Sequence, residues 1–223
     1  MKTNRSVSLF SKKGKPFVPE VVSYLKKHFR NVKIYLGAPG DVFPESAKKW
    51  KGDILISYLS PWIISHRLLQ AANEVSINFH PGPPEYPGIG CFNFALYEDA
   101  KNYGVTAHCM EEKVDTGRIL AVKRFRVHKN ESVLSLSQKS YRAMFILFRE
   151  IMSKIYSQKK LSLNGETWQR RPYLRRELEA LCKLSPRMKR NEIWRRVRAT
   201  AYPGMPGAYF EFNDMKFEYS PDR

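Results

Sequence analysis

Three polar side chains in this sequence have the types and spacing of an acyl-transfer site. Asn78 and His80 stand two positions apart at the end of an apolar run, so both would leave the same face of a strand. Asp115 follows in a turn, 35 residues after His80. An amide can donate a hydrogen bond to a tetrahedral oxyanion, an imidazole can move a proton near neutral pH, and a carboxylate can orient the imidazole. Together the three groups suit transfer of an acyl group to an amine.

The scaffold that must position these groups follows from hydrophobic periodicity. We expect strands at 6–10, 32–36, 53–58, 75–79, 105–110 and 119–127. We expect helices at 17–29, 62–71, 92–98 and 133–156, with Ser60 and Pro61 opening the second. This alternation predicts an α/β fold, a Rossmann-like and mostly parallel sheet with helices on both faces. Such sheets bind ligands beyond the carboxyl ends of their strands, where the strand 75–79 delivers Asn78 and His80.

The sequence after residue 160 is polar and basic, which predicts a small C-terminal extension. We expect one domain over residues 1–160 and an extension over 161–223 that ends in a β-hairpin. The segment 161–187 is polar and is interpreted as a linker or a partly folded segment, followed by a helix at 191–199 with Asn191 as its cap. Two short apolar runs, 208–212 and 215–219, are separated by Asn213 and Asp214, as in a hairpin.

The charge balance is strongly positive, which indicates phosphorylated partners. The net charge is +18, and the segment from Trp168 to Arg198 holds eleven Lys or Arg against three Asp or Glu. Three explanations of the positive charge in this segment remain open. It can form a solvated helix face, bind a nucleotide-diphosphate substrate or bind an RNA. Neither G-x-G-x-x-G after the first strand nor G-x-x-x-x-G-K-[ST] is present, so the usual phosphate-binding fingerprints are missing.

Other features limit the class of protein. Cys91, Cys109 and Cys182 form no C-x-x-C pair, so we expect free thiols and no structural zinc. No apolar run reaches the roughly 18 residues of a membrane span, and the first residues lack the apolar core of a secretory signal. We therefore expect no membrane association and a cytoplasmic location.

Three motifs in a fixed order carry a resemblance to a known family. They are Ser76-Ile-Asn-Phe-His-Pro-Gly-Pro-Pro-Glu-Tyr-Pro-Gly88, Gly104-Val-Thr-Ala-His-Cys-Met110 and Val114-Asp-Thr-Gly117. This sequence resembles the formyltetrahydrofolate-dependent formyltransferases, most of all the sugar N-formyltransferases, which are related to methionyl-tRNA formyltransferase. The resemblance is strong over about residues 50–125 and looser over 197–210. It implies 10-formyltetrahydrofolate as the donor, no metal, and catalytic roles for Asn78, His80 and Asp115.

The resemblance also assigns residues to the two ligands. The residues that it places against the folate are Tyr58, Leu59, Ser60, Trp62, Ile63, Met110, Glu111, Glu112 and Val114. The residues expected on the acceptor side are Pro81, Gly82, Glu85, Tyr86 and Asn93. The loop after His80 departs from the pattern Ser-Leu-Leu-Pro-x-x-Arg-Gly that is frequent in the family, and it lacks the arginine. We interpret His108 as a structural histidine.

The acceptor is the least determined part of this interpretation. The extension is too short for the C-terminal β-barrel that tRNA enzymes of the family usually carry, so we expect the amino group of a nucleotide-linked amino sugar. The charge of +18 keeps an aminoacyl-tRNA, and thus a nucleic acid, as an alternative. Hydrolysis that releases formate and a non-catalytic folate- or nucleotide-binding module are further alternatives. The hairpin and its aromatic residues suggest a homodimer.

Overall fold

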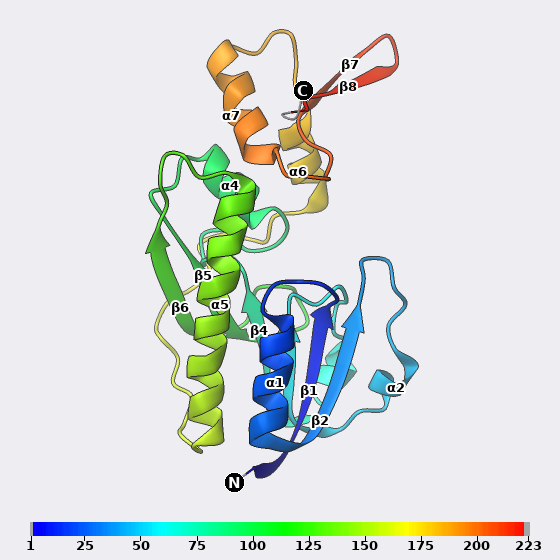
Figure 1. Cartoon of the computed structure of the whole chain (residues 1–223), viewed down its shortest axis with the longest axis vertical. Helices are drawn as coiled ribbons and strands as arrows, with labels where there is room; N and C mark the ends of the chain where they lie inside the picture. The colour runs from blue at the N-terminus through cyan, green and yellow to red at the C-terminus, as the bar shows by residue number, and fades with distance from the viewer. Residues whose placement is uncertain (1, 221–223) are drawn as a thin grey trace.

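A six-stranded sheet organises the chain, which the computed structural model describes over residues 2–220 (Figure 1). Its strand order is β2-β1-β3-β4-β5-β6. The strand bounds are Thr3–Lys12 (β1), Phe29–Gly37 (β2), Gly52–Tyr58 (β3), Ala72–His80 (β4), Asn102–Cys109 (β5) and Ile119–Arg126 (β6). The first four strands are mutually parallel, whereas β5 runs antiparallel to β4 and β6 antiparallel to β5. The predicted mostly parallel α/β sheet is confirmed.

Helices cover both faces of this sheet. Leu9 and Ile56 point to one face and pack with the two long helices, whereas Phe10 and Leu55 point to the other and pack with the two short ones. This division follows from the alternation of side chains along a strand. The long helices are α1 (Val18–His28) and α5 (Val133–Tyr156), and the short ones are α2 (Glu45–Lys48) and α3 (His66–Leu69). Within residues 2–220, no helix is both long and apolar enough to cross a membrane.

The C-terminal residues form two helices and a hairpin beside α4 (Cys91–Tyr97). These elements are α6 (Arg175–Cys182), α7 (Arg190–Thr200), β7 (Tyr209–Phe212) and β8 (Met215–Glu218). Asn93 on α4 donates to the carbonyl oxygen of Ala199 on α7 over 2.7 Å. The ring of Phe94 stacks on Tyr173 with centroids 3.7 Å apart. The expected hairpin is confirmed, and a division of the chain at residue 160 stays a prediction.

Two predicted helix starts are wrong, and one helix was missed. The region 62–71 holds only the single turn α3, because the hydroxyl of Ser60 accepts from the backbone N–H of Trp62 and closes a tight turn instead of capping a helix. Helix α7 starts at Arg190 after Lys189, so Asn191 lies inside its first turn. Helix α6 escaped prediction because Leu181 is its only fully buried residue, which leaves little apolar periodicity to detect.

Candidate active site

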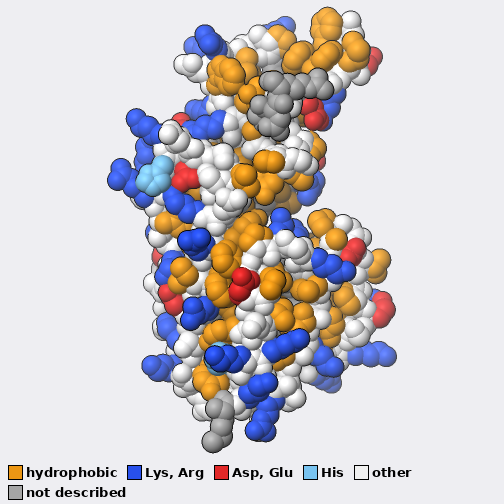
Figure 2. Space-filling view, viewed as in Figure 1, with side chains coloured by type: hydrophobic (Ala, Val, Ile, Leu, Met, Phe, Trp, Pro, Cys, Tyr) orange, Lys and Arg blue, Asp and Glu red, His pale blue; other side chains and the backbone are white. Residues whose placement is uncertain are grey.

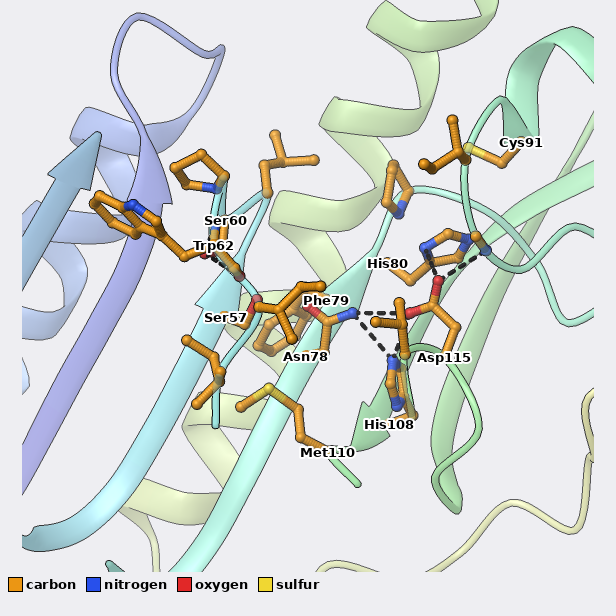
Figure 3. A pocket seen from close by; sticks show the side chains of 18 of the residues that line it. Ser57, Ser60, Trp62, Asn78, Phe79, His80, Cys91, His108, Met110 and Asp115 are labelled. Carbon is orange, nitrogen blue, oxygen red and sulfur yellow. Dashed lines mark hydrogen bonds and ion pairs between the residues drawn. The ribbon is translucent and has the colours of Figure 1, made fainter. Parts of the chain in front are cut away.

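The carboxyl ends of β3 and β4 open into a cavity of about 480 Å³. Strand β4 brings Asn78 and His80 to this cavity, β5 brings His108, and the turn after β5 brings Asp115 (Figure 3). Asn78 and His108 are register partners in the antiparallel β4–β5 pair, so their side chains leave the same face of the sheet. The structure therefore brings together the three residues expected from the sequence and adds a fourth.

The carboxylate of Asp115 is the centre of this cluster and is only 4 % exposed. Its Oδ2 lies 3.2 Å from Nδ1 of His80 and accepts from the backbone N–H of Gly88 over 2.8 Å. Its Oδ1 lies 3.2 Å from both Nδ2 of Asn78 and Nε2 of His108. Burial alone would raise the pKa of Asp115, but the charge of His80 and the hydrogen bond and charge of His108 outweigh it and hold the pKa below its usual range. Asp115 is thus an anion at neutral pH.

The turn that presents Asp115 depends on unusual backbone geometry. Asp115 has φ +48°, a left-handed conformation that Asp tolerates better than most residues. Two residues later, Gly117 lies so close to Cys109 that an added Cβ would stand 1.8 Å from its carbonyl oxygen. Only glycine fits there, so the Asp-Thr-Gly sequence is required by the turn as well as by the carboxylate.

The imidazole of His80 is held from two sides. Its Nε2 lies 2.9 Å from the carbonyl oxygen of Tyr86. Because a carbonyl oxygen only accepts, Nε2 carries a hydrogen, and Nδ1 faces the carboxylate of Asp115. Gly82 packs beneath the ring, where an added Cβ would stand 2.6 Å from Nε2. The proline-rich loop thus wraps around the imidazole, and with Nδ1 held by Asp115 a ligand reaches Nε2 by replacing the carbonyl oxygen of Tyr86.

The amide of Asn78 is oriented by His108. Nδ1 of His108 lies 2.8 Å from the carbonyl oxygen of Cys109, which only accepts, so Nδ1 carries a hydrogen. Nε2 of His108 lies 3.0 Å from Nδ2 of Asn78 and 3.2 Å from Oδ1 of Asp115. Nδ2 of Asn78 also donates to Oδ1 of Asp115 over 3.2 Å, so the amide is held against both residues. His108 is a buried and hydrogen-bonded histidine, as expected, but its place against Asn78 was not foreseen.

Trp168 closes the cluster from the C-terminal side. Its indole stands edge-on to the rings of His108 and His80, with centroids 5.1 and 5.9 Å apart. Its Nε1–H donates to the carbonyl oxygen of Gly117 over 2.8 Å. Sequence reasoning placed this residue in a linker and gave it no role. The available signal was a large apolar side chain alone in a polar, basic segment.

The predicted folate-side residues line the cavity with one exception. Ile63 is 75 % exposed and Val114 is 48 % exposed, so both present apolar surface at the mouth. Tyr58 was wrongly placed in this set, because its ring is fully buried in the core between Phe79 and Phe148. The other predicted residues that line the cavity are Leu59, Ser60, Trp62, Met110, Glu111 and Glu112.

On the acceptor side, only Pro81 and Asn93 of the five predicted residues line the cavity. Tyr86 is buried in a second apolar cluster and its hydroxyl donates to Glu98 over 2.9 Å. Glu85 forms an ion pair with Arg124 at 3.0 Å on the outer side of the loop. Gly82 lies under the His80 ring, as described above. These three residues shape the loop and do not face the cavity. Over residues 2–220, no group of three or more His, Cys, Asp or Glu is arranged to hold a metal ion.

Comparison with known proteins places this site in a family. The sequence pattern described as formyl transferase matches residues 45–148, which include all four residues of the cluster. GDP-perosamine N-formyltransferase from Brucella melitensis is 27 % identical over 195 residues, which cover 86 % of this chain and 73 % of the relative. Residues 45–148 of the chain match the formyl transferase family. The chain is an enzyme of the transferase class, a formyltransferase.

Solved structures share the fold of this formyltransferase. A sugar N-formyltransferase from a Shewanella species has a TM-score of 0.76 at 20 % identity, with 96 % of each chain covered. An N-formyltransferase from Helicobacter canadensis, solved in complex with folinic acid and dTDP-3-aminofucose, has a TM-score of 0.72 at 18 % identity. That likeness covers 96 % of this formyltransferase and 86 % of the other chain. The shared fold includes the C-terminal extension, which lies outside the matched family segment.

Proposed function

We propose that this formyltransferase moves the formyl group of 10-formyltetrahydrofolate to the amino group of a nucleotide-linked amino sugar. The observation that carries the proposal is the convergence of Asn78, His80 and Asp115 at one cavity, on the strand ends where an α/β sheet binds ligands. Folate as donor is supported by the neighbour solved with folinic acid. A sugar nucleotide as acceptor is supported by the GDP-perosamine enzyme and by the neighbour solved with dTDP-3-aminofucose.

The proposed reaction is an acyl transfer between two nitrogens. The acceptor amine attacks the formyl carbon, a C–N bond forms, and the carbonyl oxygen becomes an oxyanion. When the tetrahedral intermediate collapses, the bond from the formyl carbon to the folate nitrogen breaks, and the proton lost by the acceptor amine is delivered to that nitrogen. No oxidant, reductant or metal is needed to balance these steps.

Each of the three residues has a distinct part in this scheme. Asn78 donates to the oxyanion by turning one amide hydrogen away from His108 or Asp115, a donor worth about 3 kcal/mol in comparable sites. His80 takes the proton from the attacking amine and returns it to the leaving nitrogen. Asp115 holds the imidazole and stabilises its cationic form, because its carboxylate is buried and ionised beside Nδ1.

The two substrates are proposed to enter from opposite ends of the cavity. The apolar residues Ile63 and Val114 at one mouth suit the aromatic donor. Cys91 lies at the other end, beyond His80 (Figure 3), and together with Asn93, which also lines the cavity, it suits the acceptor. Trp62 contributes mainly through its backbone on the donor side, since its indole donates to Asp41 and packs edge-on to Phe10.

The proposal is tested by incubating the protein with 10-formyltetrahydrofolate and a panel of amino-sugar nucleotides. Mass spectrometry should find one nucleotide sugar that gains one formyl group in step with release of tetrahydrofolate. Release of formate with every acceptor would point instead to hydrolysis. Formylation of an aminoacyl-tRNA, with affinity that falls steeply as salt rises, would replace the sugar acceptor. Figure 2 shows Lys and Arg side chains scattered over the visible face, without the single dense patch typical of RNA binding.

A further inference from the structure

Three neighbouring cations at the rim of the cavity have no acidic partner, and the exposed Lys113 is a fourth unpaired cation in its lining within residues 2–220. Lys12 at the end of β1, Lys15 in the following turn and Arg175 at the start of α6 all line the cavity that holds Asn78 and His80. Over residues 2–220, none of the three forms an ion pair with a carboxylate, although ion pairs are frequent elsewhere on this chain. Their charge is therefore available to a ligand.

Five other arginines of the basic extension form ion pairs with carboxylates of this chain. Arg170 and Arg171 pair with Glu177, Arg195 and Arg196 pair with Glu192, and Arg198 pairs with Asp99. Most of the excess charge that the sequence shows between Trp168 and Arg198 is thus either used internally or located away from the cavity. Arg175 is the arginine of this segment that lines the cavity.

The three cations are close enough to repel one another. Partial burial and the charges of Lys15 and Arg175 lower the pKa of Lys12. A protein gains nothing in stability from such an arrangement, because like charges near one another destabilise the folded state. A bound anion with at least two negative charges would remove that repulsion, and a diphosphate has this charge.

The positions of Lys15 and Arg175 relate these two cations to the acceptor end of the cavity. Nζ of Lys15 lies 6.0 Å from the ring centre of Tyr141, and Tyr141 stands edge-on to Phe92 at the same centroid distance. Leu178, on the same helix as Arg175, lies against Gly90, where an added Cβ would stand 3.2 Å from it. Phe92 and Gly90 flank Cys91, which lies at the end of the cavity away from Trp62 (Figure 3).

We propose that Lys12, Lys15 and Arg175 form the subsite for the diphosphate of the acceptor nucleotide. Two lysines offer mobile point charges, and the guanidinium of Arg175 can bind phosphate oxygens through two parallel hydrogen bonds. The subsite spans β1 and α6, so the acceptor would be held between the sheet and the extension, with its amine directed to His80. This inference rests on the proposed function, because it assigns the nucleotide part of the same acceptor.

Binding of GDP and dTDP to the full chain, measured by calorimetry, tests the subsite without requiring turnover. The variants are Lys12→Gln, Lys15→Gln and Arg175→Gln, and the matched controls are Lys13→Gln and Arg176→Gln, whose native side chains are exposed and do not line the cavity. Each subsite variant should bind a nucleoside diphosphate about tenfold more weakly, and the controls should bind as wild type does. The affinity of Arg175→Lys should lie between those of wild type and Arg175→Gln, because lysine keeps the charge and loses the paired hydrogen bonds. The affinity for nucleoside monophosphates should change less in the subsite variants.

The outcomes separate this inference from the proposed function. Wild-type affinity in all three subsite variants, or failure of the wild type to bind either diphosphate, would overturn the subsite. A tRNA bound through the same three residues in the absence of nucleotide binding would also overturn it. If diphosphates bind as expected but no amino-sugar nucleotide is formylated, the subsite stands and the proposed function fails. If formylation occurs with an unchanged acceptor KM in the three variants, the proposed function stands and the subsite fails.

Discussion

The indole of Trp168 stands edge-on to the imidazole of His108 with ring centroids 5.1 Å apart, although the two residues belong to different parts of the chain. His108 lies on β5 of the sheet, and Trp168 lies in the segment that leads to α6. Through its hydrogen bond to Gly117, Trp168 also holds the turn that presents Asp115. The extension is therefore part of the wall of the site and not a separate appendage.

Replacing Trp168 should reduce turnover more than it reduces stability. Trp168→Ala removes the packing behind His80 and His108, and we expect kcat to fall about ten- to hundredfold, since small misplacements of catalytic groups have costs of this size. Trp168→Phe keeps the packing but loses the hydrogen bond to Gly117, so its kcat should fall less than that of Trp168→Ala. Trp194→Ala, at an exposed position on α7, is the control and should keep the wild-type kcat. Equal rates for Trp168→Ala and Trp194→Ala would remove Trp168 from the site.

Replacing Asn78 should affect the chemical step alone. Asn78→Ala removes the proposed oxyanion donor, and we expect kcat to fall about 10²- to 10³-fold with little change in KM for either substrate. The comparison variant is Asn73→Ala, which removes an exposed amide from the same strand. Steady-state kinetics with both substrates checks the split between kcat and KM. A variant that raises KM and keeps kcat would show that Asn78 only binds substrate.

Asp115 should give the fold a stability that depends on pH in a defined direction. Its pKa is lowered in the folded state, so its contribution is complete above the ordinary aspartate pKa of about 3.9. The contribution shrinks as the pH falls from there through the lowered pKa. Urea unfolding should show wild type more stable than Asp115→Asn by about 2 kcal/mol at neutral pH, with a smaller difference near pH 3. A difference that stays constant between these pH values would contradict the ionised, buried carboxylate.

Glycine at position 88 should be required for the contact between the proline-rich loop and the extension. Gly88 has φ +85°, and an added Cβ would lie 2.5 Å from the carbonyl oxygen of Tyr173. Gly165 has a similar φ of +83° but nothing within 4 Å of its added Cβ. Both alanine variants should lose about 1 kcal/mol from backbone strain, and Gly88→Ala should lose clearly more. Thermal unfolding of the two variants checks this prediction. Equal losses of stability would mean that the backbone of Tyr173 moves away from the added Cβ at little cost.

The parts of the fold that were predictable are those with strong local patterns. Helix α5 was predicted with its correct bounds, since apolar residues recur at helical spacing along it and Ser132 caps it by accepting from Ser135. The hairpin β7–β8 was predictable because Asn213 and Asp214 adopt positive φ between two short strands. Helix α6 lacks such a pattern, because Leu181 is its only buried residue and the ion pair between Arg171 and Glu177 at its start is exposed.

Only the site residues that lie within the sequence motifs were predictable. Asn78, His80 and Asp115 could be proposed because three motifs in a fixed order carry them, at the end of one strand and in the turn after a later one. The antiparallel register that sets His108 against Asn78 and the return of Trp168 depend on tertiary packing, which no local pattern encodes. Tyr58 was misplaced for the same reason, because a strand residue can face the core or the cavity and its neighbours in sequence do not decide which.

Formyl transfer by wild type and His80→Ala, measured side by side in a single turnover, tests the central claim most directly. The donor is 10-formyltetrahydrofolate, the acceptor is the amino-sugar nucleotide identified by the screen, and mass spectrometry follows the formylated product. We predict that His80→Ala forms it about 10²- to 10⁴-fold more slowly than wild type, while His66→Ala, at an exposed position outside the cavity, keeps the wild-type rate. Formylation by His80→Ala at the wild-type rate would contradict the assignment of this site.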